Sequence, residues 1–276
     1  MSDSGARKDS MSFWEHLDVL KTIIIKCVAV ALGFGCILFC FKDTLFNAIL
    51  APGKDGFITY NLLNRAALAI GQSPLPSFSV PLINTGLAQQ FMIHMKVAFS
   101  CGVLLAFPYI LYQLYRFVSP ALYARERQYA SGVVGWAYLM FMAGAAVSYL
   151  LIFPFTFRFL GMYQVSDEVP NMITLESYIS TLLVMCLTMG IVFEIPVLSW
   201  LFAKFGFLNA SWMRRFRKHA IVTILIVAAV ITPTSDVFTL LIVSLPMWLL
   251  YEASILIVRR AQRSHEVQVQ ISTSVE

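Results

Sequence analysis

Residues 22–41 read TIIIKCVAVALGFGCILFCF, a run of twenty residues in which Lys26 carries the one charge. About 20 largely apolar residues cross the roughly 30 Å of a bilayer's hydrocarbon as a helix. The whole chain has the same character, because 59% of its 276 residues are hydrophobic and 13% are charged, against about a quarter in a soluble domain. The alternating pattern of a membrane barrel is not evident, so the sequence predicts an all-α, polytopic membrane protein.

Six segments share this apolar character and lie between more polar connections. We predict membrane spans at 22–41, 88–113, 130–153, 177–203, 219–232 and 237–258. As a helix, the fifth would rise only about 20 Å, which is well short of the hydrocarbon thickness. It would therefore thin the bilayer or form a short hairpin with the sixth. We expect a concave bundle of six transmembrane helices whose last two spans are short.

Positive charge gathers on one side of this predicted topology. Fifteen of the 20 Lys and Arg residues fall near the two termini or in the loops after spans two and four. The positive-inside rule puts these segments, and so both termini, in the cytoplasm. The net charge of +5 is thus a topology signal rather than a nucleic-acid surface. The polar first 21 residues lead to no convincing cleavage site, so we expect span one to stay in the mature protein.

The connections complete a single membrane domain over 1–260. The long outer loop, 42–87, mixes Pro and Gly with apolar residues, and we expect it to pack as a cap with short helices. The composition of residues 261–276 predicts a disordered, polar cytoplasmic tail.

The chain lacks the residue patterns of an enzyme or a metal protein. Its five cysteines fall in apolar segments without metal-ligand spacing, and its four histidines are scattered along the chain. No Gly-rich phosphate loop leads into a Lys-Ser or Lys-Thr pair, and no Ser or Cys partner for nucleophilic catalysis is apparent. The sequence predicts no catalysis, no cofactor and no metal.

Glu194 lies well inside the fourth predicted span, in the stretch MGIVFEIPVLSW (189–200). An ionised side chain at that depth costs on the order of 3 kcal/mol unless it is protonated, hydrated or paired. Two alternatives follow: a structural carboxyl bonded to a neighbouring helix, or a polar site that faces a cavity. Pro196, two residues later, frees a backbone carbonyl and can kink the helix there.

Two acidic sites are predicted on the cytoplasmic side. Glu126 lies in FVSPALYARER (117–127), and Glu15 and Asp18 are three residues apart in FWEHLDVLK (13–21), on one helix face. Together they make a plausible receptor for a pair of cationic side chains, because guanidinium and carboxylate pair bidentately. The alternative is that Glu126 merely balances Arg125 and Arg127.

Several stretches resemble the TatC family, in the right order along the chain. They are HLDVLK (16–21), LAP (50–52), FPYILYQLYRFVSPALYARER (107–127), FEIPV (193–197) and ITPTSDVFTLLIVSLPMWLLYE (231–252). TatC is the polytopic core of the twin-arginine translocase of the bacterial plasma (inner) membrane or the thylakoid membrane, and we expect the bacterial inner membrane here. The resemblance implies a receptor for twin-arginine signal peptides, which exports folded proteins with single-span TatA-type and TatB-type partners and the protonmotive force. It also implies a homo-oligomer in the lipid bilayer and no nucleic-acid partner.

The resemblance also implies roles for particular residues. Glu126 would receive the arginine pair, with Phe117, Arg127 and the amino-terminal element completing the site. Glu194 would be the buried polar residue that contacts a partner on the concave face. The remaining family positions, structural or in loops, are Pro52, Pro120, Tyr123, Pro196 and Asp236.

The sequence departs from the family pattern in two places. Where the family has Glu three residues after the amino-terminal His, this chain has Val19, and Lys21 replaces Arg. Glu15, four residues before Val19, lies on the same helix face and could serve instead, as could Asp18. The last hairpin is one residue longer than the common form, which shifts the position that Asp236 would match.

Two rival functions remain at this point. A proton-coupled secondary transporter would use Glu194 as its proton carrier, and Glu194→Gln would then abolish uptake of a small solute. A translocase would instead show defective export of folded cargo and unaffected solutes. A purely structural membrane scaffold would tolerate the neutralisation of Glu126.

Overall fold

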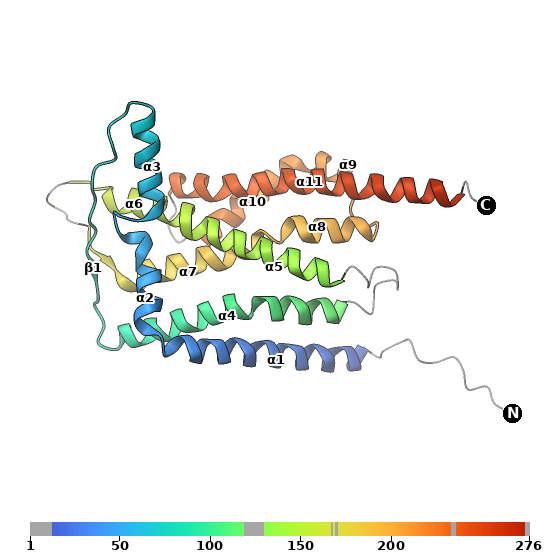
Figure 1. The fold of residues 1–276 in the computed structure, drawn as a ribbon, viewed down its shortest axis with the longest axis horizontal. Coiled ribbons are helices and arrows are strands. Elements are labelled where there is room, and N and C mark those ends of the chain that lie inside the picture. The colour runs from blue at the N-terminus through green and yellow to red at the C-terminus, as the bar shows by residue number, and fades with distance from the viewer. Residues whose placement is uncertain (1–12, 119–129, 167, 169–170, 233–235, 274–276) are drawn as a thin grey trace. The chain divides into compact units, whose positions relative to one another are not determined.

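The computed structural model describes residues 13–118, 130–166, 168, 171–232 and 236–273 (Figure 1). Helices dominate, as the composition predicts: α1 (Phe13–Phe39), α2 (Lys42–Leu50), α3 (Ile58–Ala69), α4 (Gln89–Val118), α5 (Ala130–Val147), α6 (Phe153–Met162), α7 (Leu175–Val192), α8 (Ile195–Lys204), α9 (Ala210–Arg215), α10 (Arg217–Ile231) and α11 (Val237–Thr273). A 3₁₀ turn, η1 (Ala51–Gly53), follows α2, and a π-helical turn, η4 (Ser148–Ile152), joins α5 to α6. Strands β1 (Leu82–Ile83) and β2 (Ile173–Thr174) pair in parallel.

Five helical segments among the described residues are long and apolar enough to cross a membrane. They are Leu17–Phe39, Gln89–Phe117, Gly132–Met162, Leu175–Lys204 and Val237–Gln262. Helix α10 lies where the fifth span was predicted, but its 15 residues rise only about 22 Å. The all-α membrane fold is thus confirmed, whereas the sixth crossing and the side that holds the termini stay predictions.

The third span is longer than the predicted 130–153, because the helix continues through η4 and α6 to Met162. Pro154 suggested an end there, since proline has no N–H for the carbonyl four residues earlier, that of Leu150. In the structure the Thr59 hydroxyl donates a hydrogen bond to that carbonyl oxygen. A donor from the outer loop thus replaces the missing helical one.

The last helix corrects two expectations. Its candidate span, Val237–Gln262, has 26 residues, so the sixth predicted span is not short. The helix then runs on to Thr273, where the sequence predicted a disordered tail from residue 261. Residues 261–273 contain neither Gly nor Pro, so no residue in them stops a helix that has already formed.

The fourth span is interrupted as Pro196 predicts. Helix α7 ends at Val192, α8 begins at Ile195, and Pro196 lies in the first turn of α8. Proline cannot donate to the Val192 carbonyl, so the helical ladder breaks there. Glu194 lies at the break.

The chain forms two compact units, one from residues 1–41 and 98–138 and the other from 42–97 and 139–276. In the first unit α1 and α4 lie side by side (Figure 1), in contact at small residues. A Cβ on Gly102 would lie 2.6 Å from the Ala31 carbonyl oxygen and 2.6 Å from the Gly35 nitrogen. Small residues allow such backbone approach in membrane helices. The single-domain organisation stays a prediction.

Substituting Gly102 with alanine should destabilise this helix pair. The new methyl would meet backbone atoms of α1, which cannot rotate away, and overpacking of this kind costs about 1–3 kcal/mol. The midpoint of thermal unfolding in detergent should therefore fall. Gly33→Ala is the matched control, because a Cβ on Gly33 meets nothing within 4 Å and alanine favours a helix. Equal midpoints for the two variants would contradict the close approach.

Candidate functional site

The amino-terminal end of α1 and the carboxyl end of α4 lie at the same end of the first unit. Gly102 faces Ala31 and Gly35, and Gly35 in turn faces Ala98, so the two helices run antiparallel. Phe117 is fifteen residues after Gly102, and His16 is fifteen before Ala31. Both positions are therefore about 22 Å along their helices from the same contact. This arrangement brings the backbone of Glu15 and Asp18 level with Phe117.

Two predicted site residues at this end, Asp18 and Phe117, have side chains that are at least partly exposed. Asp18 is exposed on α1, and Phe117 is half-buried near the end of α4. Glu126, Arg127, Pro120 and Tyr123 lie outside the described residues, as does the side chain of Glu15.

Two polar residues in α4 were not among the predicted site residues. Gln113 is buried, and its side-chain amide donates a hydrogen bond of 2.6 Å to the hydroxyl of Tyr109, one helical turn earlier. The Tyr115 hydroxyl is buried and lacks a hydrogen-bond partner among the described residues. Gln113 could have been found from the sequence, because it is an amide inside a predicted span and polar groups are costly there. These residues add polar character to the α4 end of the site.

Glu194 is placed in the second unit, at the break between α7 and α8. Its side chain is 7% exposed, and its Oε1 atom is buried with no hydrogen-bond partner in the described part of the chain. A structural carboxyl bonded to a neighbouring helix would use that acceptor. The unpartnered oxygen needs an explanation in a buried site, while the choice between a structural carboxyl and a polar site that faces a cavity stays a prediction.

Asp236 and Pro52 have clear local roles. Asp236 precedes α11, and its Oδ1 atom accepts a 2.7 Å hydrogen bond from the Thr239 N–H, so it caps the helix. Pro52 is buried in η1 of the outer loop. The described residues contain no group of three His, Cys, Asp or Glu side chains placed to hold a metal ion.

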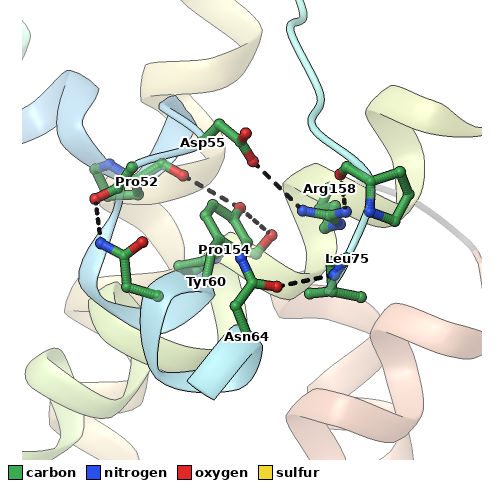
Figure 2. Close-up of polar contacts among 10 residues, drawn as sticks. Pro52, Asp55, Tyr60, Asn64, Leu75, Pro154 and Arg158 are labelled. Carbon is green, nitrogen blue, oxygen red and sulfur yellow. Dashed lines mark hydrogen bonds and ion pairs between the residues drawn. The ribbon is translucent and has the colours of Figure 1, made fainter. Parts of the chain in front are cut away.

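The outer loop forms the predicted cap with short helices, and Tyr60 of α3 lies at its centre (Figure 2). Tyr60 is fully buried, and its hydroxyl donates to the carbonyl oxygens of Pro154 at 2.8 Å and Pro52 at 3.3 Å. Burial raises the pKa of this hydroxyl, despite the opposing effect of the Arg158 charge, so it remains a donor. Arg158 bonds the Pro76 carbonyl at 2.6 Å and lies 3.7 Å from the Asp55 carboxylate. The loop is thus tied to α6 through Tyr60, Asp55 and Pro76.

Replacing Tyr60 with phenylalanine should loosen this cap. The change removes the donor to two buried carbonyl oxygens and should destabilise the protein by about 1–3 kcal/mol. Thermal unfolding in detergent measures the loss. Tyr163→Phe removes the same hydroxyl from an exposed side chain and should leave the midpoint unchanged. A Tyr60→Phe protein as stable as the wild type would exclude this role.

The fold and the site define a multi-span helical membrane protein, with acidic and aromatic side chains at one end of α1 and α4 and a buried carboxyl at a helix break. The family model described as Sec-independent protein translocase protein (TatC) matches residues 15–246. The chain therefore belongs to the TatC family, and it is a component of a Sec-independent protein translocase.

Individual TatC proteins are similar to this chain over nearly its whole length. The TatC protein of Blattabacterium sp. subsp. Periplaneta americana is 32% identical over 255 residues, covering 91% of this chain and 96% of the relative. That of Desulforapulum autotrophicum is 33% identical and covers 90% of this chain and 84% of its own length. A crystal structure of the twin arginine translocase receptor TatC superposes with a TM-score of 0.72 at 29% identity, covering 90% of this chain and 99% of that one.

Proposed function

We propose that this chain is the signal-peptide receptor and membrane core of a twin-arginine translocase in the bacterial inner membrane. It acts with single-span partners of the TatA and TatB type, as a homo-oligomer, and exports folded proteins with the protonmotive force. Six spans with both termini in the cytoplasm complete the proposed topology. The observation that carries the proposal is the antiparallel pairing of α1 with α4, in a chain of the TatC family.

The pairing supports a receptor because it brings the amino-terminal end of α1 level with Phe117 of α4. Glu126 follows Phe117 by nine residues, and Glu15 and Asp18 lie at the amino-terminal end of α1. Two carboxylates at that end would bind two guanidinium groups in bidentate pairs, which a lysine cannot form. The aromatic ring of Phe117 would cover the apolar stems of the arginine side chains.

Glu194 and α10 account for the later step in this proposal. In this proposal Glu194 is the polar residue that a single-span partner contacts; its Oε1 atom is buried and without a hydrogen-bond partner among the described residues, so the contact requires this carboxyl to become accessible on docking. Helix α10 is about 8 Å shorter than the hydrocarbon is thick, so the bilayer beside it would thin. A thinner bilayer lowers the cost of moving a bulky folded cargo.

A crosslinking experiment tests the receptor. A photo-reactive amino acid at position 117 should crosslink to a twin-arginine signal peptide in membranes, and the yield should fall severalfold when the pair is changed to two lysines. The same probe at Tyr163, an exposed residue of the second unit, is the matched control and should give little crosslinking. Equal yields for the two signals, or for the two probe positions, would overturn the proposal.

A further inference from the structure

We infer that the surface formed by Trp212, Arg214, Arg215, Lys218, Arg259 and Arg260, here called the basic patch, binds the headgroups of anionic phospholipids. The patch belongs to the second unit and lies outside the proposed signal-peptide site. Its five cations and its tryptophan are all exposed.

Hydrogen bonds between the α9 region and α11 fix the two segments that carry most of the basic patch. The Tyr251 hydroxyl donates to the Met213 carbonyl oxygen at 2.8 Å. The Gln262 side chain accepts from the Ala210 N–H at 3.2 Å and donates to the Leu208 carbonyl oxygen at 3.3 Å. The anchored segments run alongside each other (Figure 1).

A hydrophobic cluster between α9 and α11 brings the cations of these two helices together. Met213 of α9 belongs to the same buried cluster as Val258 and Ala261 of α11. Arg214 and Arg215 follow Met213 directly, while Arg259 and Arg260 lie between the two α11 residues. The charged side chains therefore border one buried contact from both sides.

The charge of the patch is not balanced within its own segments. Residues 204–219 and 251–262 contain one acidic residue, Glu252, and its carboxylate pairs with Arg217 at 2.6 Å. These two segments hold no other acidic residue to balance the five cations of the patch. Each basic residue at a bilayer surface gains about 1 kcal/mol from anionic lipid, so five of them favour such a headgroup strongly.

Position and aromatic content favour a lipid over an acidic protein as the occupant. The candidate spans Leu175–Lys204 and Val237–Gln262 both end beside the patch, where the hydrocarbon gives way to headgroups. Trp212 is 56% exposed and packs on Phe216 with ring centroids 4.6 Å apart. Tryptophan is enriched at this interface because its ring is apolar and its N–H is polar.

Fluorescence quenching in lipid nanodiscs tests the inference. The emission of Trp212 is isolated by subtracting that of the Trp212→Phe protein, and brominated phosphatidylglycerol is compared with brominated phosphatidylcholine at equal mole fraction. We expect quenching by the anionic lipid to be at least about threefold stronger in the wild type. High salt should reduce the ratio, because it screens exposed charges.

Variants decide whether the basic patch causes the preference. Changing its five cations to glutamine should bring the ratio close to one, and R259Q/R260Q alone should give an intermediate value. The control neutralises three exposed cations of the outer loop, Lys42, Lys54 and Arg65, and should keep the wild-type ratio. Equal quenching by both lipids in the wild type, or a preference that survives in the five-residue variant, would overturn the inference and leave the patch to an acidic protein.

Discussion

Changing Glu126 to glutamine is expected to lower the affinity for a twin-arginine signal peptide by about ten- to a hundredfold. A hydrogen bond to a charged group contributes about 1.5–3 kcal/mol, and each 1.4 kcal/mol is a factor of ten. Glutamine keeps the size of the side chain and one acceptor oxygen but loses the charge. The loss should therefore come from the pairing with arginine and not from packing.

Binding of a fluorescent signal peptide to the protein in detergent measures this effect. Asp43→Asn, which neutralises an exposed carboxylate of α2 in the other unit, is the control and should leave the affinity unchanged. A signal with two lysines should bind both the wild type and the Glu126→Gln protein weakly, and by similar amounts. If Glu126→Gln bound the signal peptide as tightly as the wild type, Glu126 would not be a receptor residue and would only balance the charge of its neighbouring arginines.

Two variants test which residue of the amino-terminal element supplies the second carboxylate of the receptor. Val19 stands where the family pattern has Glu, so Glu15→Gln and Asp18→Asn are compared in the same assay. The antiparallel pairing of α1 with α4 places both backbone positions level with Phe117. We expect one of the two to lower affinity, and unchanged binding in both would remove the amino-terminal element from the receptor.

The helices that hydropathy governs could be predicted from the sequence. Long apolar runs must be helical in hydrocarbon, because no water satisfies their backbone groups. The shortness of α10 and the break at Pro196 follow from local residue counts and from proline's missing N–H. These features depend on neighbours in sequence, which is why they needed no tertiary information.

The extension of α11 to Thr273 follows from local residues and could have been predicted, whereas the end of the third span was missed because distant residues decide it. The helix continues past Pro154. The Thr59 hydroxyl donates to the Leu150 carbonyl oxygen, 91 residues later in the sequence, in place of the missing helical N–H. The close approach at Gly102 and the role of Arg158 in the cap also depend on contacts between segments far apart in the chain. A single sequence does not contain these pairings in any local pattern.

The second large effect is expected at Glu194, where leucine should lower export of a folded cargo by about tenfold or more. Leucine removes the buried Oε1 acceptor that lacks a partner in the described part of the chain, and with it any contact to a docked partner. Glutamine keeps an acceptor and a similar shape, so Glu194→Gln should reduce export less, by about threefold. A polar contact in a low-dielectric setting is worth about 1–2 kcal/mol, and the tenfold loss expected for leucine corresponds to about 1.4 kcal/mol.

Stability and binding separate this role from a structural one. Replacing a buried polar group that lacks a partner with an apolar side chain is neutral or stabilising, so Glu194→Leu should unfold at the wild-type temperature or above it. Signal-peptide binding should persist, because Glu194 and the proposed receptor site lie in different units. If Glu194→Gln instead left export intact and abolished proton-coupled uptake of a small solute, Glu194 would be a proton carrier and its proposed role in export would be excluded.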